Sequence, residues 1–146
     1  MKRYLIAIYL RLSKEDSKDK AARQKGESNS IAMQRSLLKR YIEEMFTDYE
    51  IIEFCDDGYT GTNFDRPGIQ EMLKKIKSGE IDCVIVKDFS RFARDYIELG
   101  SYLEQIFPFL GVRFISVNDG YDSADVQDGI AGMDVNFKNL LSDLYS

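Results

Sequence analysis

The stretch YLIAIYLRLS, residues 4–13, decides the fold of this chain. Residues 4–10 are all apolar and rich in isoleucine and tyrosine, which is typical of a strand buried on both of its faces. Such strands belong to parallel sheets that helices cover on both sides. Arg11 and Ser13 follow the run directly, so we expect this buried strand to end in polar side chains.

Further apolar runs repeat this pattern along the chain. Strands are predicted over residues 51–55, 83–86 and 112–117. Helices are predicted over residues 30–46, 67–79 and 94–107, and loops over residues 14–28, 57–63 and 88–94. The predicted apolar face of the first helix consists of Ile31, Leu37, Leu38, Tyr41, Ile42 and Met45. Strands that alternate with helices indicate an α/β domain with a mainly parallel sheet flanked by helices.

The composition excludes several kinds of chemistry. The 146 residues suit one domain and include no His, so this chain can build neither Ser-His-Asp nor Cys-His catalysis, nor a His-ligated metal site. Cys55 and Cys83 are too few for a structural zinc site, and we interpret them as small core residues. No apolar run reaches the ~18 residues of a membrane span. The N-terminal run is too short for a signal peptide, so the cytoplasm is the expected location.

The formal net charge of −5 is unevenly distributed. Residues 1–114 contain 19 Lys+Arg and 19 Asp+Glu, whereas residues 115–146 contain one lysine and six aspartates. The acidic excess, which argues against a nucleic-acid partner, therefore belongs to the C-terminal segment. The rest of the chain can still hold a local cationic site.

Polar residues follow the predicted strands, at the points where each strand ends. Arg11 and Ser13 follow the first strand, residues 57–66 follow the second, and Arg91 and Arg94 follow the third. Ligands of parallel α/β sheets gather at the carboxyl ends of the strands. Three separate segments are therefore expected to deliver polar side chains to one edge of the sheet.

Arginines without histidine indicate phosphate chemistry at this edge. A guanidinium matches phosphate oxygens with paired hydrogen bonds and stays charged at any working pH. Tyr9, Arg11 and Ser13 alternate along one strand face, which makes Ser13 the candidate nucleophile. Arg66 is a further candidate cation. The acceptor of the serine proton is open between Asp57, an arginine and water.

Each of these patterns also has a purely structural interpretation. An arginine and a serine after a strand often only face solvent, and Arg91 with Arg94 would suit a solvated helix face. Asp57 before Gly58 would suit a turn. Asp65-Arg66-Pro67 would suit a local ion pair that caps a helix.

The C-terminal segment, residues 128–146, predicts an amphipathic helix. Its apolar stripe consists of Ile130, Met133, Phe137, Leu140, Leu141 and Leu144. The pattern runs into Ser146 without a stop signal, so we expect the natural protein to continue beyond this residue. Packing into the core is the alternative role for the stripe.

These motifs together resemble the catalytic domain of the serine recombinases, the resolvase/invertase family. The resemblance rests on YLRLS at 9–13, Gln34 within IAMQRSLL, DGYTGTNFDRPG at 57–68, VKDFSRFARD at 86–95 and FISVNDGYDS at 114–123. The sequence DGIAGMDVNFKNLLSDLYS at 128–146 is similar more specifically to the large serine recombinases of transposons and phages. The resemblance covers almost the whole chain, with the motifs in the family's order.

The resemblance implies a role for each candidate residue. Ser13 matches the nucleophile, which becomes joined to the 5′ phosphate of cleaved DNA. The arginines that hold the phosphate match Arg11, Arg91 and Arg94. Supporting positions of the pocket match Tyr9, Gln34, Asp57, Thr60 and Arg66.

The resemblance also implies partners and domains. It implies double-stranded DNA as substrate, a homodimer that forms a tetramer in the synaptic complex, and neither metal nor small-molecule cofactor. Residues 1–127 would form the catalytic domain, and residues 128–146 would begin the oligomerisation helix that leads to DNA-binding domains. Small resolvases carry Asp where Ser90 stands here. The serine is typical of the large subgroup, and it argues against schemes in which that carboxylate is the general base.

Two other functions compete with this hypothesis. The chain could be an oligomerisation module whose arginines only bind the DNA backbone, and cleavage by the full-length protein would exclude that role. It could also be a receiver-like signalling domain with Glu15, Asp16 and Asp88 as its acidic residues. A receiver leaves the arginines unexplained, and phosphorylation by a small phosphodonor would favour it.

Overall fold

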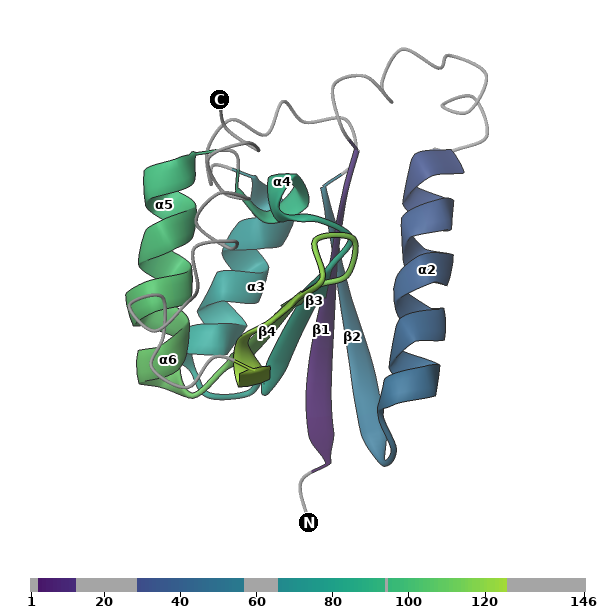
Figure 1. Ribbon diagram of the computed structural model, residues 1–146, viewed down its shortest axis with the longest axis horizontal. Coiled ribbons are helices and arrows are strands. Elements are labelled where there is room, and N and C mark those ends of the chain that lie inside the picture. Colours follow the sequence, from purple (N-terminus) through teal and green to yellow (C-terminus); the bar gives the residue numbers. More distant parts are fainter. Residues whose placement is uncertain (1–2, 13–28, 57–65, 94, 126–146) are drawn as a thin grey trace.

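The computed structural model describes residues 3–12, 29–56, 66–93 and 95–125, and a five-stranded sheet lies at its centre (Figure 1). The strand order is β2-β1-β3-β4-β5. The bounds are Tyr4–Arg11 for β1, Tyr49–Asp56 for β2, Cys83–Val86 for β3, Arg113–Ser116 for β4 and Tyr121–Asp122 for β5. Strands β1 to β4 run parallel, and β5 pairs antiparallel with β4. The predicted α/β class with a mainly parallel sheet is confirmed.

The apolar run of β1 is explained by its central position between β2 and β3. Ile6, Ile8 and Leu10 are fully buried on one face of the sheet. Ala7 and Tyr9 are fully buried on the other face. Since both faces are covered, no position within residues 6–10 is left for a solvated side chain.

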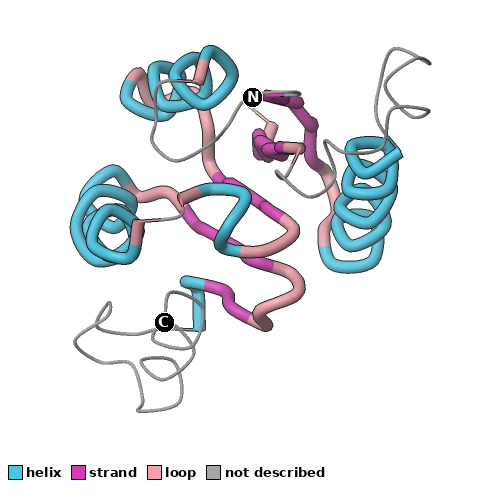
Figure 2. Tube along the Cα trace, turned by 90° about the horizontal axis from the view of Figure 1, so that it is seen from above, coloured by secondary structure: helices cyan, strands magenta, loops and turns pink. Residues whose placement is uncertain are grey.

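Helices cover the two faces of the sheet unequally (Figures 1 and 2). Among the described helices, α2 (Asn29–Met45) alone packs on the face that carries Ile6, Ile8 and Leu10. The opposite face carries α3 (Pro67–Lys77), α5 (Tyr96–Ser101), the π-helical turn η2 (Tyr102–Ile106) and α6 (Phe107–Leu110). Helices that follow neighbouring strands therefore depart to opposite sides of the sheet.

The first helix is confirmed, but one residue of its predicted apolar face is wrong. The fully buried members are Ile31, Leu38 and Ile42. Met45 is 60% exposed, because the helix ends at this residue. The next residue, Phe46, packs instead, with its ring stacked on Tyr4 at a centroid distance of 6.0 Å.

The segment predicted as a loop over 88–94 contains the short helix α4, Phe89–Phe92, so that prediction is wrong. Asp88 caps the helix, and its carboxylate accepts a hydrogen bond from the N–H of Arg91. A single turn of helix is too short for hydrophobic periodicity to reveal.

The helix predicted over 94–107 is displaced toward the C-terminus. The helical segments α5, η2 and α6 together run from Tyr96 to Leu110. Asp95 sets the start, since its carboxylate accepts the N–H groups of Ile97 and Glu98. Gly111 adopts a φ of 70° after Leu110, which ends the last turn.

Strand β5 and the 3-10 turn at Ser123–Asp125 were not predicted from the sequence. The C-terminal helix predicted over 128–146, the domain boundary at residue 127 and the loop at 14–28 lie outside the described residues. In the part of the chain that the structure describes, no helix is both long and apolar enough to span a membrane.

Candidate active site

The carboxyl ends of β1 and β3 form the edge where a ligand site is expected. In sheets of order 2-1-3-4-5, the helices that follow β1 and β3 leave on opposite faces and open a crevice between these strands. Arg11 is the last residue of β1, and Arg91 lies in the short helix that follows β3. The topology thus brings together two arginines that stand 80 residues apart.

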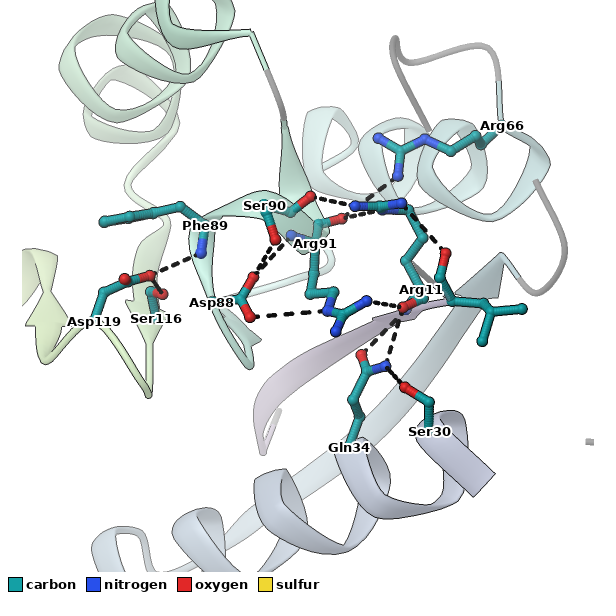
Figure 3. A network of polar contacts seen from close by, with 11 residues as sticks. Arg11, Ser30, Gln34, Arg66, Asp88, Phe89, Ser90, Arg91, Ser116 and Asp119 are labelled. Carbon is teal, nitrogen blue, oxygen red and sulfur yellow. Dashed lines mark hydrogen bonds and ion pairs between the residues drawn. The ribbon is translucent and has the colours of Figure 1, made fainter. Parts of the chain in front are cut away.

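Arg11 is almost completely buried at this edge, with 1% of its surface exposed. Its guanidinium donates from Nε to the carbonyl oxygen of Arg91 at 3.2 Å, and from Nη2 to that of Ser90 at 2.5 Å. Nη1 donates to the carbonyl of Leu12 at 3.3 Å. The charged group is therefore held in one orientation by main-chain oxygens on both sides of the crevice (Figure 3).

Arg91 in turn donates a hydrogen bond to Arg11. Its Nη1 donates to the carbonyl oxygen of Arg11 at 2.9 Å, so each arginine binds the main chain of the other. This reciprocal pair ties the end of β1 to helix α4. It fixes the relative placement of the two cations against the repulsion between their charges.

Gln34 of α2 clamps the same strand end from the opposite face. Its Oε1 accepts the N–H of Arg11 at 3.3 Å, and its Nε2 donates to the carbonyl of Arg11 at 3.0 Å. Nε2 also donates to the Ser30 hydroxyl at 3.2 Å. The side-chain amide thus completes both main-chain hydrogen bonds of the residue that ends β1.

A second layer of polar contacts joins Arg66, Tyr9 and Asp56. Arg66 donates from Nη1 to the Tyr9 hydroxyl at 2.9 Å and from Nη2 to the carbonyl of Phe92 at 3.0 Å. The Tyr9 hydroxyl donates to Asp56 Oδ2 at 2.6 Å. The same carboxylate accepts the N–H groups of Gly68 and Ile69 at 2.7 and 2.9 Å, and so caps α3.

The ionisation state of Tyr9 follows from its surroundings. Burial raises the pKa of Tyr9 far above its usual value, and the neighbouring Arg66 cation only partly opposes the rise. The phenol is therefore neutral at any working pH, and its proton stays in the hydrogen bond to Asp56. The Tyr9 hydroxyl supports the site by linking the Arg66 cation to the Asp56 carboxylate.

The two cysteines lie in the core layer under α2. Cys83 is fully buried, and burial raises its pKa to about 12, so the thiol is protonated at neutral pH. Cys55 is half-buried against the core layer under α2. Both fit the prediction of small core residues.

The structure brings together five of the predicted site residues and does not describe the others. The five that meet at the β1/β3 edge are Tyr9, Arg11, Gln34, Arg66 and Arg91. Predicted site residues outside the described part of the chain are Ser13, Asp57, Thr60 and Arg94. In the described ranges, no cluster of three acidic or cysteine residues could hold a metal ion.

Sequence reasoning missed the carboxylates that build this edge. Asp56 organises Tyr9 and the start of α3, and Asp119 accepts hydrogen bonds from the N–H of Phe89 and the Ser116 hydroxyl. The available signal was position, since Asp56 ends an apolar strand eleven residues before Pro67 opens a helix. A buried acidic residue at a strand end indicates a hydrogen-bonded cap.

The fold and this edge define an α/β domain that gathers arginines at its topological switch point. The chain belongs to the resolvase family, since the model of the resolvase N-terminal domain matches residues 6–142. The Tn917 transposon resolvase of Enterococcus faecalis is 31% identical over 81 residues, which are 56% of this chain and 42% of that protein. This chain therefore aligns with less than half the length of that relative.

Solved structures with the same fold support the assignment to this family. A resolvase family site-specific recombinase from Streptococcus pneumoniae is 30% identical, with a TM-score of 0.66 over 97% of this chain and 85% of that one. The N-terminal catalytic domain of TP901-1 integrase has the same fold, with a TM-score of 0.69 at 24% identity over 96% of this chain and 90% of that one. The expectation of a resolvase-like catalytic domain is confirmed.

Proposed function

We propose that this chain is the catalytic domain of a site-specific recombinase of the large serine subgroup, which cuts and rejoins double-stranded DNA. The observation that carries the proposal is the reciprocal pair of Arg11 and Arg91 at the β1/β3 edge. Ser13 stands two residues after Arg11 in the sequence.

In this reaction the Ser13 oxygen attacks a DNA phosphorus and loses its proton. The bond between phosphorus and the 3′ oxygen breaks, and the 3′ oxygen takes up a proton. The products are a 5′-phosphoserine ester and a free 3′ hydroxyl, and attack by a 3′ hydroxyl on the ester reverses the step. The acceptor of the serine proton is open between Asp57, an arginine and water.

Arginines supply the electrostatic part of this step. Negative charge grows on the non-bridging oxygens of the phosphodiester during attack, and preorganised donors lower its energy by roughly 3–4 kcal/mol each. Arg11, Arg91 and Arg94 take this role. Tyr9, Gln34, Asp57, Thr60 and Arg66 support the pocket. The reaction conserves the phosphodiester energy, and the proposal includes neither metal nor small-molecule cofactor.

The proposal extends to the assembly. The protein would act as a homodimer on each DNA site and as a tetramer when two sites are paired. Residues 1–127 would form the catalytic domain, and the amphipathic stripe within 128–146 would serve contacts between subunits. A DNA substrate places the protein in the cytoplasm.

The test is a covalent adduct between the full-length protein and DNA. The protein is incubated with a supercoiled plasmid that carries the DNA flanking its own gene, and the products are separated on a denaturing gel. We expect an adduct with the wild type, none with Ser13→Ala, and a normal amount with Ser36→Ala, which changes an exposed serine of α2. An adduct that persists in Ser13→Ala would exclude this serine as the nucleophile. DNA binding without any adduct would favour a module that only binds the DNA backbone.

A further inference from the structure

The short helix that presents Arg91 is held by a carboxylate at its first residue. Asp88 Oδ1 accepts the Ser90 hydroxyl at 2.5 Å and the N–H of Arg91 at 3.2 Å. The second oxygen, Oδ2, lies 3.9 Å from Arg91 Nε. One carboxylate therefore contacts the main chain, the side chain and the preceding residue of the same arginine (Figure 3).

A second carboxylate holds the other side of this helix. Asp119 Oδ2 accepts the N–H of Phe89 at 2.8 Å and the Ser116 hydroxyl at 2.6 Å. Asp119 joins the start of α4 to the end of β4, whereas Asp88 reaches Arg91 itself. Removal of Asp88, and not of Asp119, would therefore change the orientation of the Arg91 side chain.

The placement of Arg91 decides the placement of Arg11. Arg11 donates to the carbonyl oxygens of Ser90 and Arg91, and Arg91 donates back to the carbonyl of Arg11. A shift of α4 would therefore move the carbonyl oxygens that accept hydrogen bonds from the Arg11 guanidinium. It would also move the Arg91 guanidinium, which donates to the carbonyl of Arg11. Asp88 is partly shielded, with 23% of its side chain exposed, and Arg91 is more so at 8%, so water screens their contact only in part.

We propose that Asp88 is a positioning residue, which directs Arg91 and, through Ser90 and Arg91, Arg11 toward the DNA phosphate. This rests on the proposed function of the site. Asp88 itself need not touch DNA, because its carboxylate acts through Ser90 and Arg91. Ser90 therefore has a role in this arrangement, since its hydroxyl donates a hydrogen bond to the carboxylate of Asp88.

The first test compares variants of Asp88 in the adduct assay. Asp88→Ala removes every contact, and we expect adduct formation to slow by about 100-fold, as small misplacements in an active site can cause. Asp88→Asn keeps an oxygen that can accept both hydrogen bonds, and we expect it to be at least about tenfold faster than Asp88→Ala. Binding of the same plasmid should change less than about twofold in both variants.

A control separates positioning from stability. Asp82 Oδ2 accepts the N–H of Leu5 at 2.8 Å, at the amino end of the sheet. Asp82→Ala therefore loses a hydrogen bond of the same kind without reaching the arginines, and we expect its melting temperature to fall while its adduct rate stays normal. A normal rate in Asp88→Ala, or an equal slowing in Asp82→Ala at the same loss of stability, would overturn the proposal.

A second readout does not depend on activity. In nuclear magnetic resonance spectra of the ¹⁵N-labelled chain, Arg91 Nε–H should exchange with water about tenfold faster in Asp88→Ala than in the wild type. Asp82→Ala should retain the wild-type protection, whereas Asp88→Asn should lose part of it, because its amide places an NH2 group where Oδ2 faces Arg91 Nε. Unchanged exchange in Asp88→Ala would overturn the positioning role. Absence of an adduct in the wild type would instead contradict the proposed function, and the exchange rates alone would then decide whether Asp88 directs Arg91.

Discussion

At the residue scale, one buried carboxylate leaves no room for a side chain beside it. Asp56 accepts hydrogen bonds from the Tyr9 hydroxyl and from the N–H groups of Gly68 and Ile69. A Cβ atom at position 68 would lie 2.7 Å from the carbonyl oxygen of Cys55 and 2.9 Å from both carboxylate oxygens of Asp56. Glycine is required here by close contact, and not by its φ angle.

We therefore expect Gly68→Ala to lower the free energy of unfolding by roughly 1–3 kcal/mol. The added methyl group must displace either the main chain of β2 or the Asp56 carboxylate. The matched control is Gly100→Ala in α5, where a Cβ would meet no atom within 4 Å. Helix propensity predicts a gain of up to about 1 kcal/mol for that control. Urea denaturation measures both variants, and an unchanged midpoint for Gly68→Ala would show that the carboxylate moves without cost.

At the scale of elements, the sequence predicts those that carry an unbroken apolar run, a repeated apolar period or a clear start signal. The run at 83–86 predicts β3 with its observed bounds, and Pro67 predicts the start of α3. Helix α4 has four residues and β5 has two, so neither is long enough to show a period. Both are fixed by contacts with distant residues, such as the pairing of β5 with β4. No local pattern carries that information.

The same limit applies to the site. The carboxyl ends of the strands predict where polar residues gather, and Arg11 and Arg91 do meet there. The hydrogen bonds between these arginines and opposite main-chain carbonyls could not be predicted, because they depend on the register of β1 with β3. Gln34 was selected only through the family resemblance. Its clamp on Arg11 spans 23 residues and two elements.

This clamp makes a prediction at the scale of elements. Gln34→Leu removes both hydrogen bonds to Arg11 while filling a similar volume, and we expect the free energy of unfolding to fall by roughly 1–3 kcal/mol. Gln105→Leu makes the same chemical change at an exposed position of η2 and should shift stability by less than about 0.5 kcal/mol. Thermal unfolding followed by circular dichroism compares them. Equal melting temperatures for the two variants would contradict a clamp that joins α2 to β1.

At the scale of the whole molecule, the two ends of the sheet differ in what their charges do. The carboxyl end gathers Arg11 and Arg91 at the candidate site. At the amino end, Arg113 of β4 donates two hydrogen bonds to Asp122 of β5, and its Nε lies 2.9 Å from Asp122 Oδ1. The Arg113 guanidinium also lies 5.2 Å from the ring centroid of Phe46, which follows α2. The Arg113 guanidinium thus connects β5 to the residues packed on the α2 face of the sheet and stabilises the fold.

The ion pair predicts how stability depends on pH. Burial by itself raises the pKa of Asp122, but the hydrogen bonds from Arg113 and from the N–H of Ala124 outweigh burial, so the pKa is lowered on folding. A carboxyl group with a lowered pKa in the folded state stabilises the protein above its unfolded pKa of about 3.9. That contribution is lost as the pH falls from about 4 through the folded value.

Asp122→Asn should therefore lower the free energy of unfolding by about 1–2 kcal/mol at neutral pH, where the carboxylate is charged. The difference from the wild type should shrink as the pH falls below about 4 and vanish once the carboxyl is protonated in the folded state as well. Asp125→Asn changes the net charge equally at an exposed position and serves as the control. Urea denaturation of the three proteins over a series of pH values measures these differences. A difference between Asp122→Asn and the wild type that stays constant down to full protonation would mean that the geometry of the side chain, and not its charge, holds β5 to Arg113.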